Sequence, residues 1–167
     1  MFSKALLMAG LAGMLCMSAW ARENAHLEVG IKGGAGAYGA DEGSRSFGHV
    51  GVEVCAYCGG RYSIFGEYGH WLSSGQLRAG QIDSADLFGV GLRIQGRRRV
   101  RPFFDIGLAV GRDNFVRDVR TNAGVVLGGG VMVPVGKHLY LRPQVRLYGM
   151  SEFRAAASAE VGFGWRF

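Results

Sequence analysis

Long apolar runs are scarce in this sequence, and after residue 21 none approaches the length of about 20 that a membrane-spanning helix needs. Proline is rare, with 3 residues, and charged residues make up only 19% of the chain. Glycine, in contrast, occurs 29 times and weakens helix interiors, which argues against a helical protein. Because 49% of the 167 residues are hydrophobic, we expect apolar side chains to be distributed over the β-strands of one domain.

The N-terminus has the order of a secretory signal peptide. Lys4 supplies a positive start, residues 5–17 form an apolar stretch, and Ala19-Trp20-Ala21 fits a small-x-small cleavage site. We therefore predict a cleaved signal peptide over 1–21 and a mature domain over 22–167. A retained anchor helix is the alternative, but the apolar stretch is short for a membrane span and is broken by glycines.

Cysteine is also scarce, with 3 in the chain. Cys16 would leave with the signal peptide, which leaves Cys55 and Cys58 in a C-x-x-C spacing. Redox-active pairs of this kind open a helix in a thioredoxin-like unit. Here the pair is followed by Gly59-Gly60-Arg61 and then by a strand, and a zinc site would need two more ligands nearby. We therefore predict a disulfide that staples a turn in an oxidising compartment, with neither a metal nor a cofactor.

The positive charge of the chain is mostly scattered. The formal net charge of +6 falls to +5 when Lys4 leaves with the signal peptide. Only residues 97–99 and 101, all arginine, form a cluster. Nucleic-acid binding would require an aromatic platform or a helix beside them. They lie instead between two alternating segments, so we interpret them as a solvated turn and expect no nucleic-acid partner.

Eight segments of the mature chain alternate between apolar residues and residues that are charged or glycine. In the last segment, Ala159 and Val161 lie on one face, whereas Glu160 and Arg166 lie on the other. Strands of a transmembrane barrel are segments of about ten residues with this alternation. We therefore predict an all-β fold, an eight-stranded antiparallel up-and-down transmembrane β-barrel preceded by a cleavable signal peptide. The segments lie near residues 27–32, 49–54, 62–71, 88–94, 103–111, 122–133, 139–148 and 157–167.

Alternation alone does not say which face lies outside, because a soluble lipocalin-type barrel also alternates, with its apolar face inside. The charged face of these segments is rich in glycine, which suits a cramped interior better than a water-exposed surface. It also carries equal numbers of acids and bases, which favours buried ion pairs. We therefore predict a lumen plugged by a salt-bridge network of Glu28, Lys32, Glu53, Glu67, Arg93, Asp105, Arg142, Arg146, Glu160 and Arg166.

The connections between the segments alternate in length. The short ones lie at 55–61, 95–101 and 134–137, and the other set, roughly 33–47, 72–82, 112–121 and 149–155, is mostly longer and polar. Bacterial barrels have short periplasmic turns and longer outer loops, so we assign the two sets accordingly. A G-x-G-x-x-G spacing at 34–39 lacks the helix that a dinucleotide site requires, and we interpret it as part of a flexible outer loop.

The last residues of the chain carry a family resemblance. Phe167 is terminal, and Trp165, Phe163 and Val161 precede it at alternating positions. This segment resembles the carboxy-terminal β-signal of outer-membrane barrels. Together with the signal peptide and the eight segments, it makes the chain similar to the small outer-membrane β-barrel protein family, of which the membrane domain of outer membrane protein A is one type. The resemblance implies a place in the outer membrane of a Gram-negative bacterium and recognition by the barrel assembly machinery.

The resemblance assigns no single task, because one fold serves many functions. We expect a monomer without catalytic residues, with a structural, adhesive or lipid-contacting role and with outer-membrane lipid and lipopolysaccharide as partners. Arginines near the outer loops could bind lipopolysaccharide phosphates or could be ordinary solvated residues: Arg45, Arg78, Arg112, Arg117, Arg120 and Arg154. Aromatic residues near the strand ends are interpreted as an interfacial girdle: Tyr38, Phe47, Trp71, Phe115 and Tyr148.

Three alternatives stay open. The first is a hydrolase or acyltransferase that modifies lipid A or phospholipid at the rim, which needs a nucleophile beside a base. Barrel lipid A deacylases have a histidine and a serine close together on one strand, but no histidine of this chain has a serine two residues later. The second is a soluble periplasmic ligand-binding barrel, and the third is a narrow channel. The local candidates for the enzyme are His70, Ser73, Ser74, Asp83 and Asp86.

Overall fold

The computed structural model describes residues 26–40, 43–73, 82–115, 118–151 and 155–167, which form an all-β barrel. The predicted signal peptide over 1–21 lies outside the described residues. No helix in the described ranges is long and apolar enough to span a membrane. The strands are β1 (Glu28–Ala40), β2 (Gly43–Ala56), β3 (Tyr62–Ser73), β4 (Ile82–Gln95), β5 (Arg101–Phe115), β6 (Asp118–Pro134), β7 (Leu139–Met150) and β8 (Ala156–Arg166).

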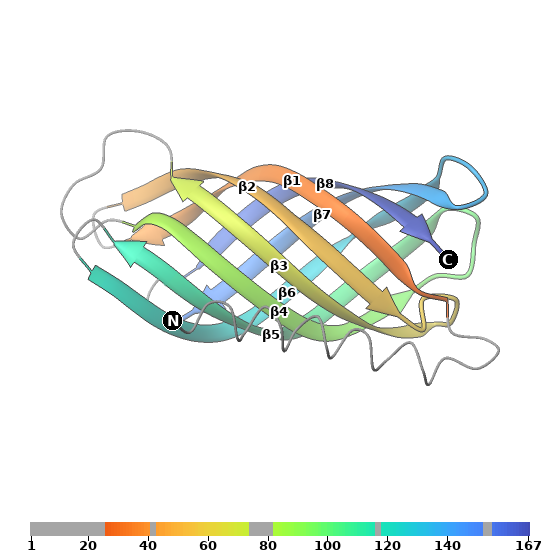
Figure 1. Cartoon of the computed structure of the whole chain (residues 1–167), viewed down its shortest axis with the longest axis horizontal. Helices are drawn as coiled ribbons and strands as arrows, with labels where there is room; N and C mark the ends of the chain where they lie inside the picture. Colours follow the sequence, from red (N-terminus) through yellow and green to blue (C-terminus); the bar gives the residue numbers. More distant parts are fainter. Residues whose placement is uncertain (1–25, 41–42, 74–81, 116–117, 152–154) are drawn as a thin grey trace.

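Each strand pairs antiparallel with its neighbour in the sequence, and β1 also pairs with β8, so the sheet closes on itself (Figure 1). This confirms the predicted eight-stranded antiparallel up-and-down barrel. The turns at 57–61, 96–100 and 135–138 and the C-terminus lie at one end of the barrel, on the right in Figure 1. We call it the turn end, and the opposite end the loop end.

Successive residues of each strand point to opposite sides of the barrel wall. Ile31 and Leu108 face outward and are both 65% exposed, whereas Arg93 and Asp105 face the lumen and are 0% exposed. Since side chains alternate along a strand, each apolar position in the sequence pattern falls on one face and each charged position on the other. The barrel is therefore apolar outside and charged inside, the reverse of a soluble ligand-carrying barrel.

Two connections predicted as loops are largely strand. β1 continues to Ala40 and β2 begins at Gly43, so the range 33–47 holds a paired ladder and the G-x-G-x-x-G run lies within β1. The glycines serve close packing: a Cβ on Gly34 or Gly36 would overlap the backbone carbonyl oxygens of β8. In a barrel, glycine can therefore mark a tight strand contact and not a flexible loop. In the same way, β5 and β6 take up most of the range 112–121.

Candidate functional site

The centre of the lumen is organised around one carboxylate, that of Glu53 on β2. Arg93 Nη1 on β4 lies 2.8 Å from Glu53 Oε1, and Arg146 Nη2 on β7 lies 3.1 Å from Oε2. Arg142 on β7 donates a further hydrogen bond to Oε1. Because these strands lie on different sides of the barrel, the contacts cross the lumen. Glu53 is 2% exposed, so its charge depends on these cations in place of water.

The network extends from Glu53 to the other predicted charges. Asp105 accepts two hydrogen bonds of 2.8 Å from Arg93, a bidentate pair. Arg146 Nη2 also lies 3.0 Å from Asp105 and 3.1 Å from Glu67. Lys32 contacts Glu67 and lies 3.2 Å from Glu160. One connected network therefore joins these residues: Lys32, Glu53, Glu67, Arg93, Asp105, Arg142, Arg146 and Glu160.

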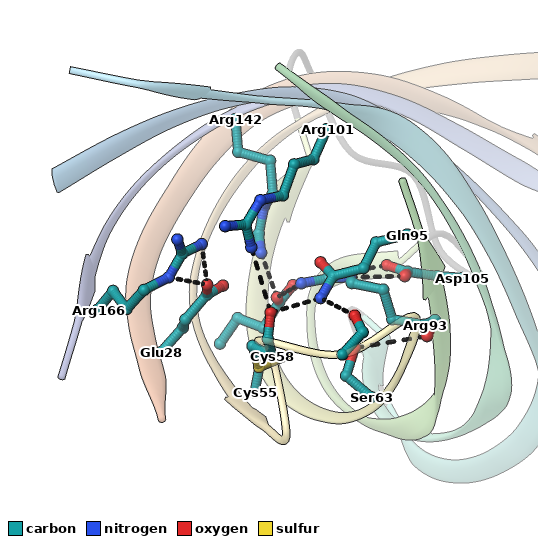
Figure 2. Close-up of a disulfide and its surroundings, with 12 residues drawn as sticks. Glu28, Cys55, Cys58, Ser63, Arg93, Gln95, Arg101, Asp105, Arg142 and Arg166 are labelled. Carbon is teal, nitrogen blue, oxygen red and sulfur yellow. Dashed lines mark hydrogen bonds and ion pairs between the residues drawn. A yellow bond between two sulfur atoms is a disulfide. The ribbon is translucent and has the colours of Figure 1, made fainter. Parts of the chain in front are cut away.

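The two remaining residues of the predicted network form a separate pair at the turn end. Arg166 Nε on β8 donates to Glu28 Oε1 on β1 at 2.6 Å (Figure 2). Beside it, Cys55 and Cys58 form a disulfide that spans the turn between β2 and β3. The carbonyl of Cys58 accepts hydrogen bonds from Gln95 and Arg101, which ties this turn to β4 and β5. The lumen charges thus make one network and one isolated pair.

The lumen also holds several polar residues that the alternation of charged residues did not predict. His49 Nδ1 lies 3.1 Å from Glu160 Oε1, and Ser158 and Gln144 donate hydrogen bonds to the same carboxylate. Nearer the loop end, Asn122 donates to Asp113, and both are buried. All of these residues lie on the inward parity of their strands. Extending the alternation to neutral polar residues and to the full strand lengths would have found them.

Aromatic side chains fill the lumen at the loop end. Phe47 and Trp71 stack with ring centroids 4.0 Å apart, and Trp71 meets Tyr148 edge to face at 4.9 Å. Tyr38 lies beside Phe47, and Phe115 packs against the cluster. The prediction that these five residues form an interfacial girdle is therefore wrong for the four that are buried inside the barrel, Tyr38, Phe47, Trp71 and Tyr148. All four occupy inward-facing positions, because the alternation of side chains between the two faces continues to the ends of the strands.

Aromatic rings also line the charged zone. The guanidinium carbon of Arg93 lies 4.5 Å from the ring centroid of Phe103 and 5.5 Å from that of Phe65. Arg146 lies 5.0 Å from the same Phe65 ring. A cation above a ring face is attracted by the ring quadrupole, and more strongly where water is excluded. The rings therefore add support for buried arginines that carboxylates already hold.

A second polar cluster faces outward near the loop end, which we call the rim cluster: Tyr68, His70, Asp86 and Arg112. Asp86 Oδ1 on β4 lies 2.8 Å from His70 Nδ1 and accepts a 2.7 Å hydrogen bond from the Tyr68 hydroxyl, both on β3. Arg112 on β5 is opposite Asp86 in the register. The cluster lies at the edge of the apolar outer surface, directly beyond Phe88 and Val110 on the outward faces of β4 and β5.

The structure separates most of the predicted catalytic candidates. Ser73 lies on the opposite parity of β3 from His70, so their side chains point to opposite faces of the wall. Asp83 likewise lies on the opposite parity of β4 from Asp86. Ser74 lies outside the described residues. Only His70 and Asp86 come together, so that an acid orients a potential base. Among the described contacts, no serine hydroxyl is hydrogen-bonded to His70, as a nucleophile would need to be.

Of the arginines assigned to the outer loops, Arg45, Arg112 and Arg120 are described, and Arg78, Arg117 and Arg154 lie outside the described residues. Arg112 and Arg120 are exposed. The Nε of Arg120 lies 3.0 Å from Asp118 Oδ2, and its guanidinium carbon lies 5.0 Å from the Phe115 ring centroid. At the loop end, Arg112 and Arg120 are therefore accessible cations.

The predicted assembly signal lies on the outer face of β8. Val161, Phe163, Trp165 and Phe167 all point outward and are exposed. Trp165 stacks on His138 with ring centroids 5.6 Å apart. The strand that carries these residues is paired on both sides, with β7 and with β1. In the closed barrel this apolar row is therefore part of the outer surface.

Comparison with protein families matches residues 7–167 to the outer membrane protein beta-barrel domain. Comparison with curated protein sequences finds no significant match. Among solved structures, Neisserial surface protein A is similar with a TM-score of 0.67 and 12% identity, over 87% of this chain and 98% of that protein.

Two further solved structures share the fold. Ail, the attachment invasion locus protein of Yersinia pestis, solved with the heparin analogue sucrose octasulfate, has a TM-score of 0.59 and 12% identity, over 87% of this chain and 100% of Ail. The outer membrane enzyme PagL has a TM-score of 0.51 and 12% identity, over 82% of this chain and 97% of PagL. Since a surface protein, an attachment protein and an enzyme share one barrel, the fold alone does not assign the function.

Proposed function

Because the chain belongs to the outer membrane protein β-barrel family and is an outer-membrane protein, we propose that it serves at the cell surface as a monomeric, non-enzymatic barrel with a structural, adhesive or lipid-contacting role. The observation that carries the proposal is the filled lumen. The network around Glu53 crosses the barrel, and the cluster of Phe47, Trp71 and Tyr148 fills the space beside it. A barrel of about eight strands encloses an interior just large enough for such side chains, so they fill the lumen and leave no open pore.

Planar-bilayer recording tests the absence of a pore. We expect the purified, folded protein to give no steady ion current, because charged and aromatic side chains occupy the axis. Replacing both Phe47 and Trp71 by glycine removes the two stacked rings at the loop end and tests whether the salt-bridge network alone keeps the lumen closed; we expect no steady current from this variant either. A steady current through the unaltered protein, scaling with the number of inserted molecules, would contradict the plugged lumen and favour a narrow channel.

Export and assembly are part of the proposal. The signal peptide over 1–21 is removed on export, and the barrel assembly machinery reads the C-terminal segment that ends in Phe167. N-terminal sequencing of protein isolated from membranes should begin at Arg22; a mass that includes residues 1–21 would refute cleavage. Replacing Phe167 by serine should lower the folded amount in cells without lowering refolding in detergent, whereas equal losses in both would assign Phe167 a merely structural role.

At the surface, we propose that the exposed arginines of the loop end contact lipopolysaccharide phosphates. Arg112 and Arg120 are the described residues that support this role, and guanidinium groups bind phosphate through paired hydrogen bonds. The similar protein Ail was solved with a polyanion, sucrose octasulfate. We expect the double variant Arg112→Gln/Arg120→Gln to bind lipopolysaccharide several-fold more weakly in nanodiscs. Arg97→Gln/Arg98→Gln, at the other end, is the control with the same charge loss; equal weakening by both would remove the assignment.

A lipid-modifying enzyme is the second candidate, because the pairing of His70 with Asp86 orients an imidazole at the edge of the apolar surface. A base held in this way could activate water or a hydroxyl against a lipid ester. PagL has a similar fold and is an enzyme. Mass spectrometry of lipid A and phospholipids from cells that express the protein, His70→Ala or Asp86→Asn decides between the two. Identical lipid profiles in all three would remove the enzyme, and a product lost only in the variants would establish it.

A further inference from the structure

A cluster of basic side chains surrounds the mouth of the lumen at the turn end. It draws on three segments that are distant in the sequence: the turn at 96–100 with the start of β5, the turn at 135–138, and the end of β8. They enclose a cavity of about 150 Å³. Its basic lining residues are Arg99, Arg101, Lys137, His138 and Arg166. The arginines at 97–99 and 101, predicted to form a solvated turn, thus lie in one basic cluster with the turn at 135–138 and the end of β8.

The positive charge at this mouth is poorly neutralised. Arg166 pairs with Glu28, as described above. Among the described residues, no carboxylate lies within ion-pair distance of Arg99, Arg101 or Lys137. Like charges gathered around a concave site raise the local concentration of anions and hold a counter-ion there. The cavity therefore combines a shape and a potential that favour a bound anion.

An apolar floor separates this cavity from the salt-bridge network deeper in the lumen. Met132 and Tyr140 line it and, with Phe103, form a small buried hydrophobic cluster. An anion that enters the mouth meets this floor and stays among the basic side chains. Figure 2 shows Arg101 and Arg166 reaching into the mouth from β5 and β8. The site is thus a dead-end pocket and not the entrance of a channel.

We propose that this mouth is a binding site for a phosphate-type anion, supplied by a phospholipid head group of the periplasmic leaflet or by a free phosphate-bearing solute. Bacterial barrels have short periplasmic turns, which places the turn end on the periplasmic side. Guanidinium groups form forked hydrogen bonds with phosphate oxygens, and the Lys137 amine adds a point charge. A cavity of about 150 Å³ holds such a group with a few waters, at about 30 Å³ of liquid volume for each water. The pocket is too small for a whole lipid, which would leave its acyl chains in the membrane.

The test uses the mature protein in nanodiscs and a pair of matched variants. Arg99→Gln/Lys137→Gln removes two exposed charges that line the cavity. Arg97→Gln/Arg98→Gln removes two charges from the same basic turn that do not line it. Both variants should fold, because all four side chains are exposed, and an unheated gel checks this. Removing charge-assisted hydrogen bonds should weaken anion binding by about tenfold or more for the cavity variant.

Two arms distinguish the sources of the anion. In the first, calorimetry measures inorganic phosphate and pyrophosphate binding in nanodiscs of zwitterionic lipid. In the second, native mass spectrometry counts phosphatidylglycerol retained from mixed-lipid nanodiscs. Loss of binding in the cavity variant alone, in either arm, supports the proposal and identifies the source. Equal losses in both variants, or no binding by the unaltered protein in either arm, would overturn it.

Discussion

Two zones of the lumen lie next to each other along the barrel axis: the salt-bridge network around Glu53 and the aromatic cluster around Phe47 and Trp71. Both exclude solvent, and in both the largest side chains are buried. They differ in what holds them in place. The aromatic cluster gains from every apolar surface removed from water, whereas each charge of the network loses hydration that only its partners replace.

This difference predicts how each zone responds to damage. An apolar cluster loses the energy of the atoms removed and of the cavity left behind, and its neighbours relax to reduce the loss. In the network, one removed carboxylate leaves a buried excess of positive charge that water cannot solvate. We therefore expect the charged zone to be more sensitive to a single substitution, although its net contribution to stability is the smaller of the two.

The largest effect is expected for Glu53→Gln, which keeps the shape of the side chain and removes its charge. Three arginines contact this carboxylate, so the substitution should lower the free energy of unfolding by about 3–5 kcal/mol. Urea unfolding of the protein in lipid vesicles, followed by tryptophan fluorescence, measures the change.

A second variant separates charge from packing at this site. Adding Arg142→Met to Glu53→Gln removes the cation whose only ion-pair partner among the described residues is Glu53, and it should restore part of the stability. If the double variant is less stable than Glu53→Gln alone by the full cost of another lost contact, the comparison between the two zones is wrong.

A smaller effect is expected for Phe47→Ala in the aromatic cluster. The substitution removes the ring that stacks on Trp71 and should lower the free energy of unfolding by about 3 kcal/mol. Phe47→Leu serves as the control that keeps most of the volume, and it should lose much less. Equal losses for alanine and leucine would mean that ring stacking and not volume dominates in this zone.

Glu28→Gln at the turn end should cost less than either change in the lumen. Its partner Arg166 has 24% of its side chain exposed, so water can solvate the guanidinium that the substitution leaves behind. We expect a loss of about 1 kcal/mol, which shrinks as salt is added because ions reach the partly exposed guanidinium of Arg166. A loss as large as that of Glu53→Gln would show that this pair behaves as a buried one.

No measurable change is expected for Asp118→Asn at the loop end. The carboxylate of Asp118 and its partner Arg120 are 59% and 51% exposed, and exposed ion pairs contribute little to stability. This variant is the baseline against which the other three are compared. An unfolding midpoint clearly below that of the unaltered protein would indicate that β6 needs this pair to begin where it does.

Most of the fold could be predicted from the sequence, because in a barrel wall every second residue of a strand faces the lumen and the others face outward. Side chains alternate strictly along a strand, so the position of Glu53 or Arg93 relative to its apolar neighbours already assigned it to one face. Charge balance on that face then indicated a closed interior. Neither inference required knowledge of which strands are neighbours.

Two predictions that rested on local sequence context alone are wrong. The glycine-rich spacing at 34–39 predicts a flexible loop, but the close approach of β8 explains Gly34 and Gly36, and that contact is about 120 residues away in the sequence. The aromatic residues were assigned by their distance from strand ends, and parity was not applied to them. The alternating connection lengths predict that the turns near 96–100 and 135–138 share one end of the barrel, but they do not predict the cavity there, which depends on side-chain packing in the closed barrel.

The hydrogen bond between Glu28 and Arg166 joins residues 138 positions apart, and it lies in the seam where β1 meets β8. A contact of such high sequence separation forms only after nearly the whole chain has been synthesised, and it makes a large entropic demand on folding. The barrel therefore cannot close while the chain is still being translated, because β8 is the last strand to be made. Until this seam closes, both edge strands expose unpaired amides and carbonyls, which makes the unclosed sheet prone to pair with other chains.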